Sequence, residues 1–209
     1  MTHLFLVRHG ETDWNAAKRI QGSTDIPLTD TGRAQAGRPG RLLSTRAWDG
    51  IVSSPLARAV ETASLIAREI GLDDPTEIDA IAERNYGEAE GLDYVTLDRL
   101  YPNKSAIPGR ESRAEVAARV LPALGDLARR RAGQSIVVVT HGGVIRTLLG
   151  QVAPGDTRLA GIPITNGSVH SFRFRDGALD LHLFDDQIDA APGEGRATHV
   201  ATSTADRAG

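Results

Sequence analysis

The sequence predicts an α/β protein with a mostly parallel sheet covered by helices on both faces, as in a three-layer α/β/α sandwich. Two observations lead to this prediction. Short, purely apolar runs typical of strands buried on both faces recur along the chain, and segments with apolar residues at helical spacing follow them. Alternating strands and helices are typical of parallel sheets, because each crossover helix packs back onto a face of the sheet.

The first half of the chain is predicted to contain two strands with a helix between them. Residues 4–7, Leu-Phe-Leu-Val, are continuously apolar, and Ile51-Val52 form a shorter run of the same kind. Residues 29–48 have a helical pattern. We expect Pro39-Gly40 to interrupt it, because proline cannot donate the helical hydrogen bond and glycine has a low helix propensity.

Two longer helices are predicted next. Apolar residues recur at helical spacing over residues 56–67, and we expect Ser54 to be the N-cap with Pro55 at the first helical position. The second pattern covers residues 116–127, in a helix that we expect to kink at Pro122.

The last part of the pattern predicts a strand, a short helix and a hairpin. Residues 136–139, Ile-Val-Val-Val, form the strand, and residues 144–149 form the helix. Apolar residues then alternate with polar ones on both sides of Asp176-Gly177, a dipeptide typical of the type I′ turn. This hairpin would add antiparallel strands to the sheet.

We expect the chain to form one domain followed by a tail. The 209 residues suit a single domain, which we place at residues 1–188, with a short lid at about residues 84–110. From residue 189 to residue 209 the composition shifts to Ala, Gly, Thr and charged residues without apolar periodicity. That composition predicts a disordered tail.

Composition limits the function before any motif is considered. With 24 Lys plus Arg and 27 Asp plus Glu, the net charge of -3 gives no reason to expect a nucleic acid or an anionic membrane as partner. The absence of cysteine excludes disulfides and thiol nucleophiles. No signal-peptide pattern and no apolar stretch near the ~18 residues of a membrane span are present, so we expect a cytoplasmic protein. A homodimer is compatible with the sequence, although no apolar stripe points to one.

The three expected buried strands lead into residues that suit phosphate chemistry. Arg8-His9-Gly10 follow the first strand, Arg58 lies in the helix after the second, and His141-Gly142-Gly143 follow the third. Ligands of parallel sheets bind beyond the carboxyl ends of the strands, so neighbouring strands would bring these residues to one pocket. Guanidinium groups match phosphate oxygens, glycines let backbone amides approach, and a neutral imidazole can attack phosphorus.

Each of these signals is weak when taken alone. A single histidine after a strand is more often a packing residue, and a single arginine is more often a hydrated surface side chain. As a cation in the first turn of a helix, however, Arg58 opposes the helix dipole at a cost of about 0.3–1 kcal/mol, which a bound anion would remove. We expect no metal site, because no third ligand stands at standard spacing from His9 and His141.

These residues belong to a pattern that resembles the histidine phosphatase superfamily, in its phosphoglycerate mutase-like branch (branch 1). The matching blocks are Leu6-Val7-Arg8-His9-Gly10-Glu11-Thr12 with Asn15, Gln21-Gly22 with Pro27-Leu28-Thr29, Ser53-Ser54-Pro55-Leu56-Ala57-Arg58-Ala59 with Glu61-Thr62-Ala63, and Thr140-His141-Gly142-Gly143. The resemblance extends to the last hairpin. It implies the phosphoglycerate mutase-like fold and a reaction that needs neither a metal nor an organic cofactor.

The resemblance also implies a role for each matching position. His9 would be phosphorylated during the reaction, and Glu83 would be the proton donor. The phosphate pocket would be completed by Arg8, Arg58, His141, Asn15 and the Gly142 backbone, and the substrate would be contacted by Gln21, Gly22, Arg84 and Tyr86. Glu83 suits its role chemically, because a nearby phosphate dianion raises the pKa of a carboxyl group. Without the resemblance, a surface glutamate would be the better interpretation.

The family contains phosphatases and mutases, and two features of the chain point in different directions. Mutases carry a longer insertion with an adjacent arginine pair, which the segment from Gly91 to Gly109 lacks. The sequence Glu83-Arg84-Asn85-Tyr86-Gly87, in contrast, is close to the mutase form. We therefore expect a phosphomonoester hydrolase for a small phosphorylated metabolite, with a cofactor-dependent phosphoglycerate mutase as the alternative. A non-catalytic phospholigand-binding module is a third interpretation, although every expected reacting position is intact.

Overall fold

The computed structural model describes residues 1–103, 106–156, 159 and 162–183, and its centre is a six-stranded sheet. The strands are β1 Thr2–Arg8, β2 Gly50–Ser53, β3 Thr76–Glu77, β4 Ser135–Thr140, β5 Val169–Arg175 and β6 Ala178–Leu183. Their order is β3-β2-β4-β1-β5-β6. The pairs β3–β2, β2–β4 and β4–β1 are parallel, whereas β1–β5 and β5–β6 are antiparallel. The predicted tail at residues 189–209 lies outside the described residues.

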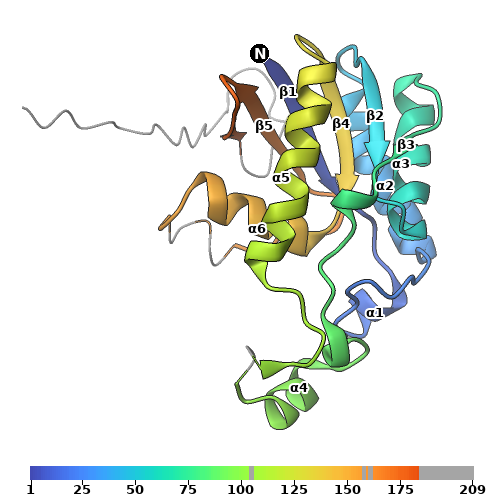
Figure 1. Cartoon of the computed structure of the whole chain (residues 1–209). Coiled ribbons are helices and arrows are strands. Elements are labelled where there is room, and N and C mark those ends of the chain that lie inside the picture. Colours follow the sequence, from blue (N-terminus) through green and yellow to red (C-terminus); the bar gives the residue numbers. More distant parts are fainter. Residues whose placement is uncertain (104–105, 157–158, 160–161, 184–209) are drawn as a thin grey trace, which may run out of the picture.

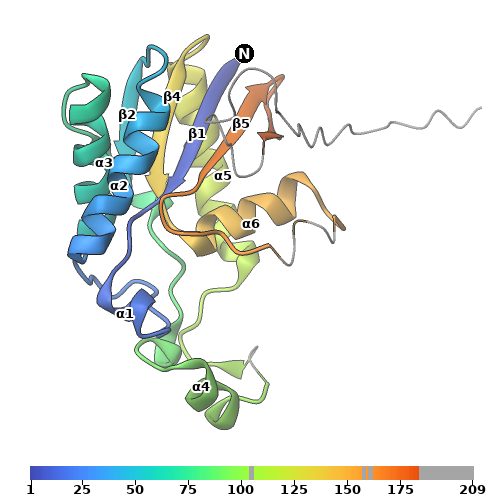
Figure 2. The same cartoon turned by 180° about the vertical axis from the view of Figure 1, so that it is seen from behind.

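Helices cover both faces of this sheet. They are α1 Asp13–Ala16, α2 Asp30–Leu43, α3 Ala57–Ile70, α4 Tyr94–Leu100, α5 Arg113–Arg130 and α6 Gly142–Val152, with the 3-10 helices η1 Asp79–Ile81 and η2 Gly87–Ala89. α5 and α6 lie on one face (Figure 1), and α2 and α3 lie on the other (Figure 2). The predicted three-layer α/β/α sandwich is therefore confirmed.

The central strand β1 explains why its sequence is continuously apolar. Leu4 and Leu6 pack into the cluster beneath α5 and α6. Phe5 and Val7 point the opposite way, into the cluster beneath α2 and α3. Successive strand residues face opposite sides of a sheet, so a strand covered on both faces needs apolar residues throughout.

The predicted hairpin is confirmed as β5 and β6. Asp176 and Gly177 between the strands have φ values of 53° and 82°. Positive φ at both central residues is what the type I′ turn requires.

The predicted interruption of the helix expected at residues 29–48 is wrong. The helix α2 runs from Asp30 to Leu43 through Pro39 and Gly40. Both residues are buried in the described structure. A Cβ added to Gly40 would lie 3.0 Å from the Cγ of Glu69 in α3, so the missing side chain lets the two helices approach closely. Packing of this kind outweighs intrinsic propensity.

The predicted start of the next helix is also wrong. α3 begins at Ala57 with Leu56 as its N-cap, and Leu56 makes no side-chain capping bond. Asp25, from a loop distant in sequence, instead accepts the N–H of Ala57 at 2.9 Å. The expected cap Ser54 lies before the helix and contacts a histidine, as described below. Farther along the chain, α5 continues through Pro122 as one helix.

A small subdomain lies beyond the carboxyl edge of the sheet, where α1 and α4 are seen in Figure 1. Its own apolar cluster consists of Ile20, Ala89, Leu97 and Ile107. This cluster supports the part of the chain in which we expected the lid. Within the residues that the structure describes, no helix is long and apolar enough to span a bilayer.

Candidate active site

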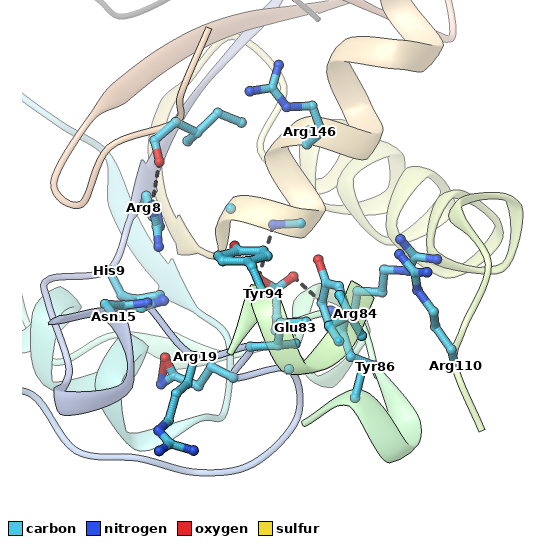
Figure 3. A pocket seen from close by; sticks show the side chains of 18 of the residues that line it. Arg8, His9, Asn15, Arg19, Glu83, Arg84, Tyr86, Tyr94, Arg110 and Arg146 are labelled. Atoms are coloured by element: carbon cyan, nitrogen blue, oxygen red, sulfur yellow. Dashed lines mark hydrogen bonds between the residues drawn. The ribbon is translucent and has the colours of Figure 1, made fainter. Parts of the chain in front are cut away.

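The carboxyl ends of β1, β2 and β4 bring the predicted phosphate residues together. Val139 of β4 is in register with Val7 on one side and with Ser53 on the other, so the three strands end at the same level. The pairing continues one residue beyond the strand, because the His9 N–H donates to the Thr140 carbonyl at 3.0 Å. A cavity of about 360 Å³ opens at this edge (Figure 3).

His9 lines the cavity and is buried, with 3% of its surface exposed. Its Nδ1 lies 2.6 Å from the carbonyl oxygen of Gly10. A carbonyl can only accept, so Nδ1 carries the proton and Nε2 keeps its lone pair. Burial, together with the charges of Arg8 and Arg58, lowers the pKa of His9 well below its ordinary value. The imidazole is therefore neutral near pH 7, which is the form that a nucleophile needs.

His141 lies beside His9, with the two ring centroids 5.1 Å apart. It is fully buried, and its Nε2 is 2.7 Å from the hydroxyl of Ser54, which joins the ends of β2 and β4. Its Nδ1 is buried without a hydrogen-bond partner among the described residues. Burial and the neighbouring positive groups lower the pKa of His141 as well. His141 is not among the residues that line the cavity, so its expected contact with the phosphate stays a prediction.

Arg58 is fully buried in the first turn of α3, which excludes the reading of a hydrated surface arginine. Its guanidinium donates to the carbonyls of Gly22 and Thr24 at 2.7 and 2.8 Å. Burial lowers the pKa of Arg58 to about 10, so the side chain remains charged at neutral pH. The only carboxylate paired with it in the described chain, Asp25, is 3.9 Å away. The buried cation is thus poorly compensated, as expected of an anion site.

Arg8, at the end of β1, is the second arginine that lines the cavity beside His9. Its Nη1 donates to the carbonyl of Ile164 at 2.5 Å, while its Nε is buried with no partner in the described structure. Burial lowers the pKa of Arg8, although the charge of Glu83 opposes that effect. A Cβ on Gly142 would approach this Nε to 3.3 Å, so the glycine leaves room beside the guanidinium.

Glu83 faces the cavity from the loop after η1. Its two carboxyl oxygens accept backbone N–H groups, from Gly143 at 3.0 Å and from Arg84 at 2.8 Å. Burial nevertheless raises the pKa of Glu83, in opposition to these hydrogen bonds and to the nearby arginines. The carboxyl group is therefore closer to holding a proton at neutral pH than an ordinary glutamate. In Figure 3 it lies between Arg8 and His9 on one side and Arg84 and Tyr86 on the other.

The structure also brings the remaining predicted residues to the same cavity. Its lining includes Asn15, Gln21, Gly22, Arg84, Tyr86 and Gly142. Gly22 has a φ of 59°, and a Cβ there would collide with the carboxylate of Glu90. Burial raises the pKa of Tyr86 to about 12, so its hydroxyl keeps its proton and remains a donor.

Sequence reasoning missed a set of cationic residues in the outer wall. The lining includes four arginines that were not assigned, Arg19, Arg110, Arg113 and Arg146. The sequence also contained no indication of Asn166. Its side-chain amide donates to the His9 carbonyl at 2.9 Å and to Asn15 Oδ1 at 3.2 Å. None of these residues belongs to a motif that we recognised. The only signal available was the local excess of arginine around Arg110 and Arg113.

No group of three or more His, Cys, Asp or Glu side chains in the described part of the chain is arranged to hold a metal ion. The cavity lining instead combines seven arginines with one carboxylate, Glu83. This lining suits an anion, which guanidinium and backbone N–H groups can bind directly.

Comparisons with known proteins agree with this geometry. The family model of the histidine phosphatase superfamily (branch 1) matches residues 4–187. An uncharacterized phosphatase of Bacillus subtilis, PhoE, is 37% identical over 174 residues, which are 83% of this chain and 89% of that protein. A 2,3-bisphosphoglycerate-dependent phosphoglycerate mutase of Cytophaga hutchinsonii is 30% identical over 87% of this chain and 92% of its own.

A solved structure is similar over almost its whole length. It is that of a variant phosphoserine phosphatase from Entamoeba histolytica in complex with phosphoserine. The TM-score is 0.76 at 31% sequence identity, and the match covers 90% of this chain and 99% of that chain. The curated and structural relatives therefore include both phosphatases and mutases.

Proposed function

This chain belongs to the histidine phosphatase superfamily (branch 1), and from that membership we propose that it is a phosphomonoester hydrolase that forms a phosphohistidine on His9. The observation that carries the proposal is the state of His9. Its Nε2 has a lone pair, the ring is neutral, and the cavity around it is lined by Arg8 and Arg58. A nucleophile and two phosphate-binding cations thus meet at one place.

In the first step, Nε2 of His9 attacks phosphorus while the bond from phosphorus to the ester oxygen breaks. Arg8 and Arg58 stabilise the charge on the equatorial phosphate oxygens. The electron pair of the broken bond goes to the leaving oxygen, and Glu83 supplies the proton that converts it to an alcohol. The raised pKa of Glu83 favours the protonated form that this step requires.

In the second step, water attacks the phosphorus of phosphohistidine, and Glu83, now a carboxylate, takes a proton from that water. The N–P bond breaks, its electron pair returns to Nε2, and inorganic phosphate leaves. Glu83 borders both the main cavity and a second cavity on its other side, lined by Asp79, Asn85 and Arg119 among others. Both cavities are open to solvent, which favours hydrolysis over a mutase reaction that must exclude water from the phosphoenzyme.

The outer arginines favour a substrate with a second anionic group. The guanidinium carbons of Arg84 and Arg110 lie 5.2 and 5.6 Å from the ring centroid of Tyr86. Burial and the charges of Arg110 and Arg113 lower the pKa of Arg84, which is the signature of like charges held together. Glu111, whose charge opposes this effect on Arg84, is itself paired with Arg119 at 2.7 Å.

These arginines lie across Glu83 from His9 (Figure 3), so an ester bound through its phosphate at His9 would extend toward them. A carboxylate or a second phosphate on the substrate would be held there. The names of two similar proteins support this choice, because phosphoserine and phosphoglycerate both carry a carboxylate. Arg146 contributes less, since its guanidinium donates to the carbonyls of Leu159 and Ile162.

A cofactor-dependent phosphoglycerate mutase is the second candidate. It is favoured by Arg84 and Tyr86, which face the cavity beside Glu83 in the sequence that resembles the mutase form. A non-catalytic binding module is less well supported, because His9, Glu83 and both inner arginines are present and close together.

The test is a panel of phosphate esters without added metal, assayed for free phosphate and, with 3-phosphoglycerate, for 2-phosphoglycerate. The panel includes matched pairs with and without a carboxylate, such as phosphoserine and phosphoethanolamine. We expect phosphate release that is abolished in His9→Ala, and a higher kcat/KM for the carboxylate member of each pair. Isomerisation of 3-phosphoglycerate with little phosphate release would identify a mutase. Near-wild-type turnover by a folded His9→Ala protein would remove His9 from the mechanism.

A further inference from the structure

The backbone around Glu83 accepts hydrogen bonds from a single arginine, Arg119. Arg119, in the middle of α5, donates hydrogen bonds to three carbonyl oxygens of this loop. They belong to Ala80 at 2.7 Å, Ala82 at 2.8 Å and Glu83 at 3.2 Å. The remaining carbonyl, that of Ile81, accepts the Thr140 hydroxyl at 2.8 Å. The carbonyl groups of residues 80–83 thus all accept hydrogen bonds from side chains. These bonds hold the backbone at Glu83 in place.

The same guanidinium pairs with Glu111. Arg119 Nε lies 2.7 Å from one carboxylate oxygen of Glu111, and Arg119 Nη2 lies 2.9 Å from the other. Both side chains are largely shielded, with 27% and 18% of their surface exposed, so the pair is worth more than a surface salt bridge.

Glu111 in turn holds the far side of the Glu83 loop. Its carboxylate accepts the Asn85 N–H at 3.2 Å, and its own N–H donates to the Asn85 carbonyl at 2.9 Å. Its backbone carbonyl accepts Nε of Arg84 at 2.5 Å. Arg119 and Glu111 therefore clamp residues 80–85 on both sides of the carboxyl group that faces the substrate.

The clamp borders empty space. The second cavity is a wide depression of about 610 Å³ that is open to solvent, and its lining includes Ala82, Glu83, Asn85, Glu111 and Arg119. Among residues 80–85, only Ile81 belongs to the apolar core. Without the clamp, the Glu83 backbone would be free to move into the cavity and away from the leaving group.

We propose that Arg119 and Glu111 are positioning residues that fix Glu83 within reach of the leaving-group oxygen. The inference rests on the proposed role of Glu83 as proton donor. Arg119 contacts the backbone carbonyl of Glu83, while the carboxyl group is held by the amides of Gly143 and Arg84. The pair therefore controls where the proton is delivered. A shift of about 1 Å is enough to cost up to ~100-fold in a proton transfer of this kind.

The experiment compares two substrates that differ in how much they need an acid. An alkyl phosphate has a poor leaving group, whereas p-nitrophenolate leaves with little protonation. We measure kcat/KM for both in Glu83→Gln, Arg119→Met and the double variant. Arg129→Met is the control, because Arg129 lies in the same helix and pairs with Asp126 on the surface. Glu111→Gln is measured in parallel and provides the test if Arg119→Met does not fold.

We expect Glu83→Gln to lower the ratio of alkyl to p-nitrophenyl kcat/KM by ~100-fold, and Arg119→Met and Glu111→Gln to lower it by about tenfold. The control should leave the ratio unchanged. In the Glu83→Gln background, Arg119→Met should change kcat/KM for the alkyl phosphate by less than about twofold. The reason is that Arg119 acts through the Glu83 carboxyl group, which is already absent in that background. The positioning role would be overturned if Arg119→Met and Glu111→Gln lowered kcat/KM equally for both substrates. It would also be overturned if Arg119→Met caused the same loss in the Glu83→Gln background as in the wild type. An unchanged ratio in Glu83→Gln itself would instead overturn the proposed role of Glu83, and this inference with it.

Discussion

Among single residues, Gly143 has a tight steric requirement beside the expected proton donor. It is the second residue of α6, and its N–H donates to Glu83. A Cβ at this position would lie 2.4 Å from Oε1 of Glu83 and 3.2 Å from the hydroxyl of Tyr86. Contacts under 3.0 Å do not occur between real atoms of this kind, so a larger residue must displace the proton donor. Gly143 is therefore needed for the space it leaves as well as for its N–H.

The substitution Gly143→Ala should reduce kcat by roughly 100-fold with a poor leaving group, because it moves Glu83 and leaves His9 in place. Gly150→Ala is the matched control, since Gly150 lies in the same helix with nothing within 4 Å of an added Cβ. The control should keep full activity and gain up to about 1 kcal/mol of stability. Steady-state kinetics and thermal unfolding test both. Equal activity in the two variants would contradict the steric argument.

At the residue scale, the sequence predicted the inner half of the site better than the outer half. Arg8, His9 and His141 follow strands whose apolar runs are unmistakable, so their convergence could be foreseen. Arg110, Arg113 and Asn166 come from loops or from a helix end, and the fold alone decides what they face. The importance of Arg119 could not be foreseen either, because it depends on backbone carbonyls that no sequence pattern reveals.

At the scale of elements, one carboxylate joins two loops that contribute to the lining of the cavity. Glu90, just after η2, accepts the N–H and hydroxyl groups of Ser23 and Thr24 and the N–H of Tyr86, at 2.5–3.0 Å. Partial burial would raise the pKa of Glu90, but these hydrogen bonds lower it. The loop that it holds contains the carbonyls that bind Arg58. Glu90 is thus a clasp between the Ser23-Thr24 loop and Tyr86.

Replacing Glu90 by glutamine should weaken substrate binding. An amide NH₂ would face the donors of Thr24 or Ser23, so hydrogen bonds worth about 1–3 kcal/mol would be lost and the Arg58 loop would loosen. We expect KM to rise at least several-fold, with a small decrease in melting temperature. Glu88→Gln is the control, because Glu88 is exposed and accepts only the Tyr101 hydroxyl in the described structure. A KM equal to that of the control variant would argue against the clasp.

The elements themselves were predictable where burial on both faces produces a continuous apolar run, as in β1 and β4. They were less predictable where packing opposes local propensity. Pro39 and Gly40 argued against a continuous helix, and only the close approach of α3 to Gly40 shows why the glycine is tolerated. The N-cap of α3 was misplaced for a similar reason, since the group that caps it belongs to Asp25, distant in sequence.

At the scale of the whole molecule, buried histidines link stability to pH. His170, in β5, is fully buried beside Ser168, and burial lowers its pKa from 6.5 to about 4. His9 and His141 shift in the same direction. The unfolded chain binds protons at these sites below pH 6.5 before the folded protein does. The stability that they provide is therefore present above pH 6.5 and is lost as the pH falls toward 4.

For His170 alone, this linkage amounts to about 2 kcal/mol between pH 7 and pH 5. The free energy of unfolding of His170→Asn should therefore decrease less over this range than that of the wild type, by about that amount. Ser171→Ala is a suitable control, because it alters the neighbouring buried position without removing a titrating group. Denaturant unfolding at pH 7 and pH 5 measures the difference. Parallel pH dependence in wild type and His170→Asn would show that His170 is not the source.

The position of β1 in the sheet has a consequence for how the protein folds. β1 carries His9 at its end, but its partners are β4, from Ser135, and β5, from Val169. During synthesis β1 emerges before both of its partners, so the pairing of this reactive strand is completed late. Contacts so distant in sequence slow folding. Until the last of them forms, β1 is an apolar edge without a partner, exposed to aggregation. In this protein, catalytic competence and escape from aggregation should therefore arrive together, late in folding.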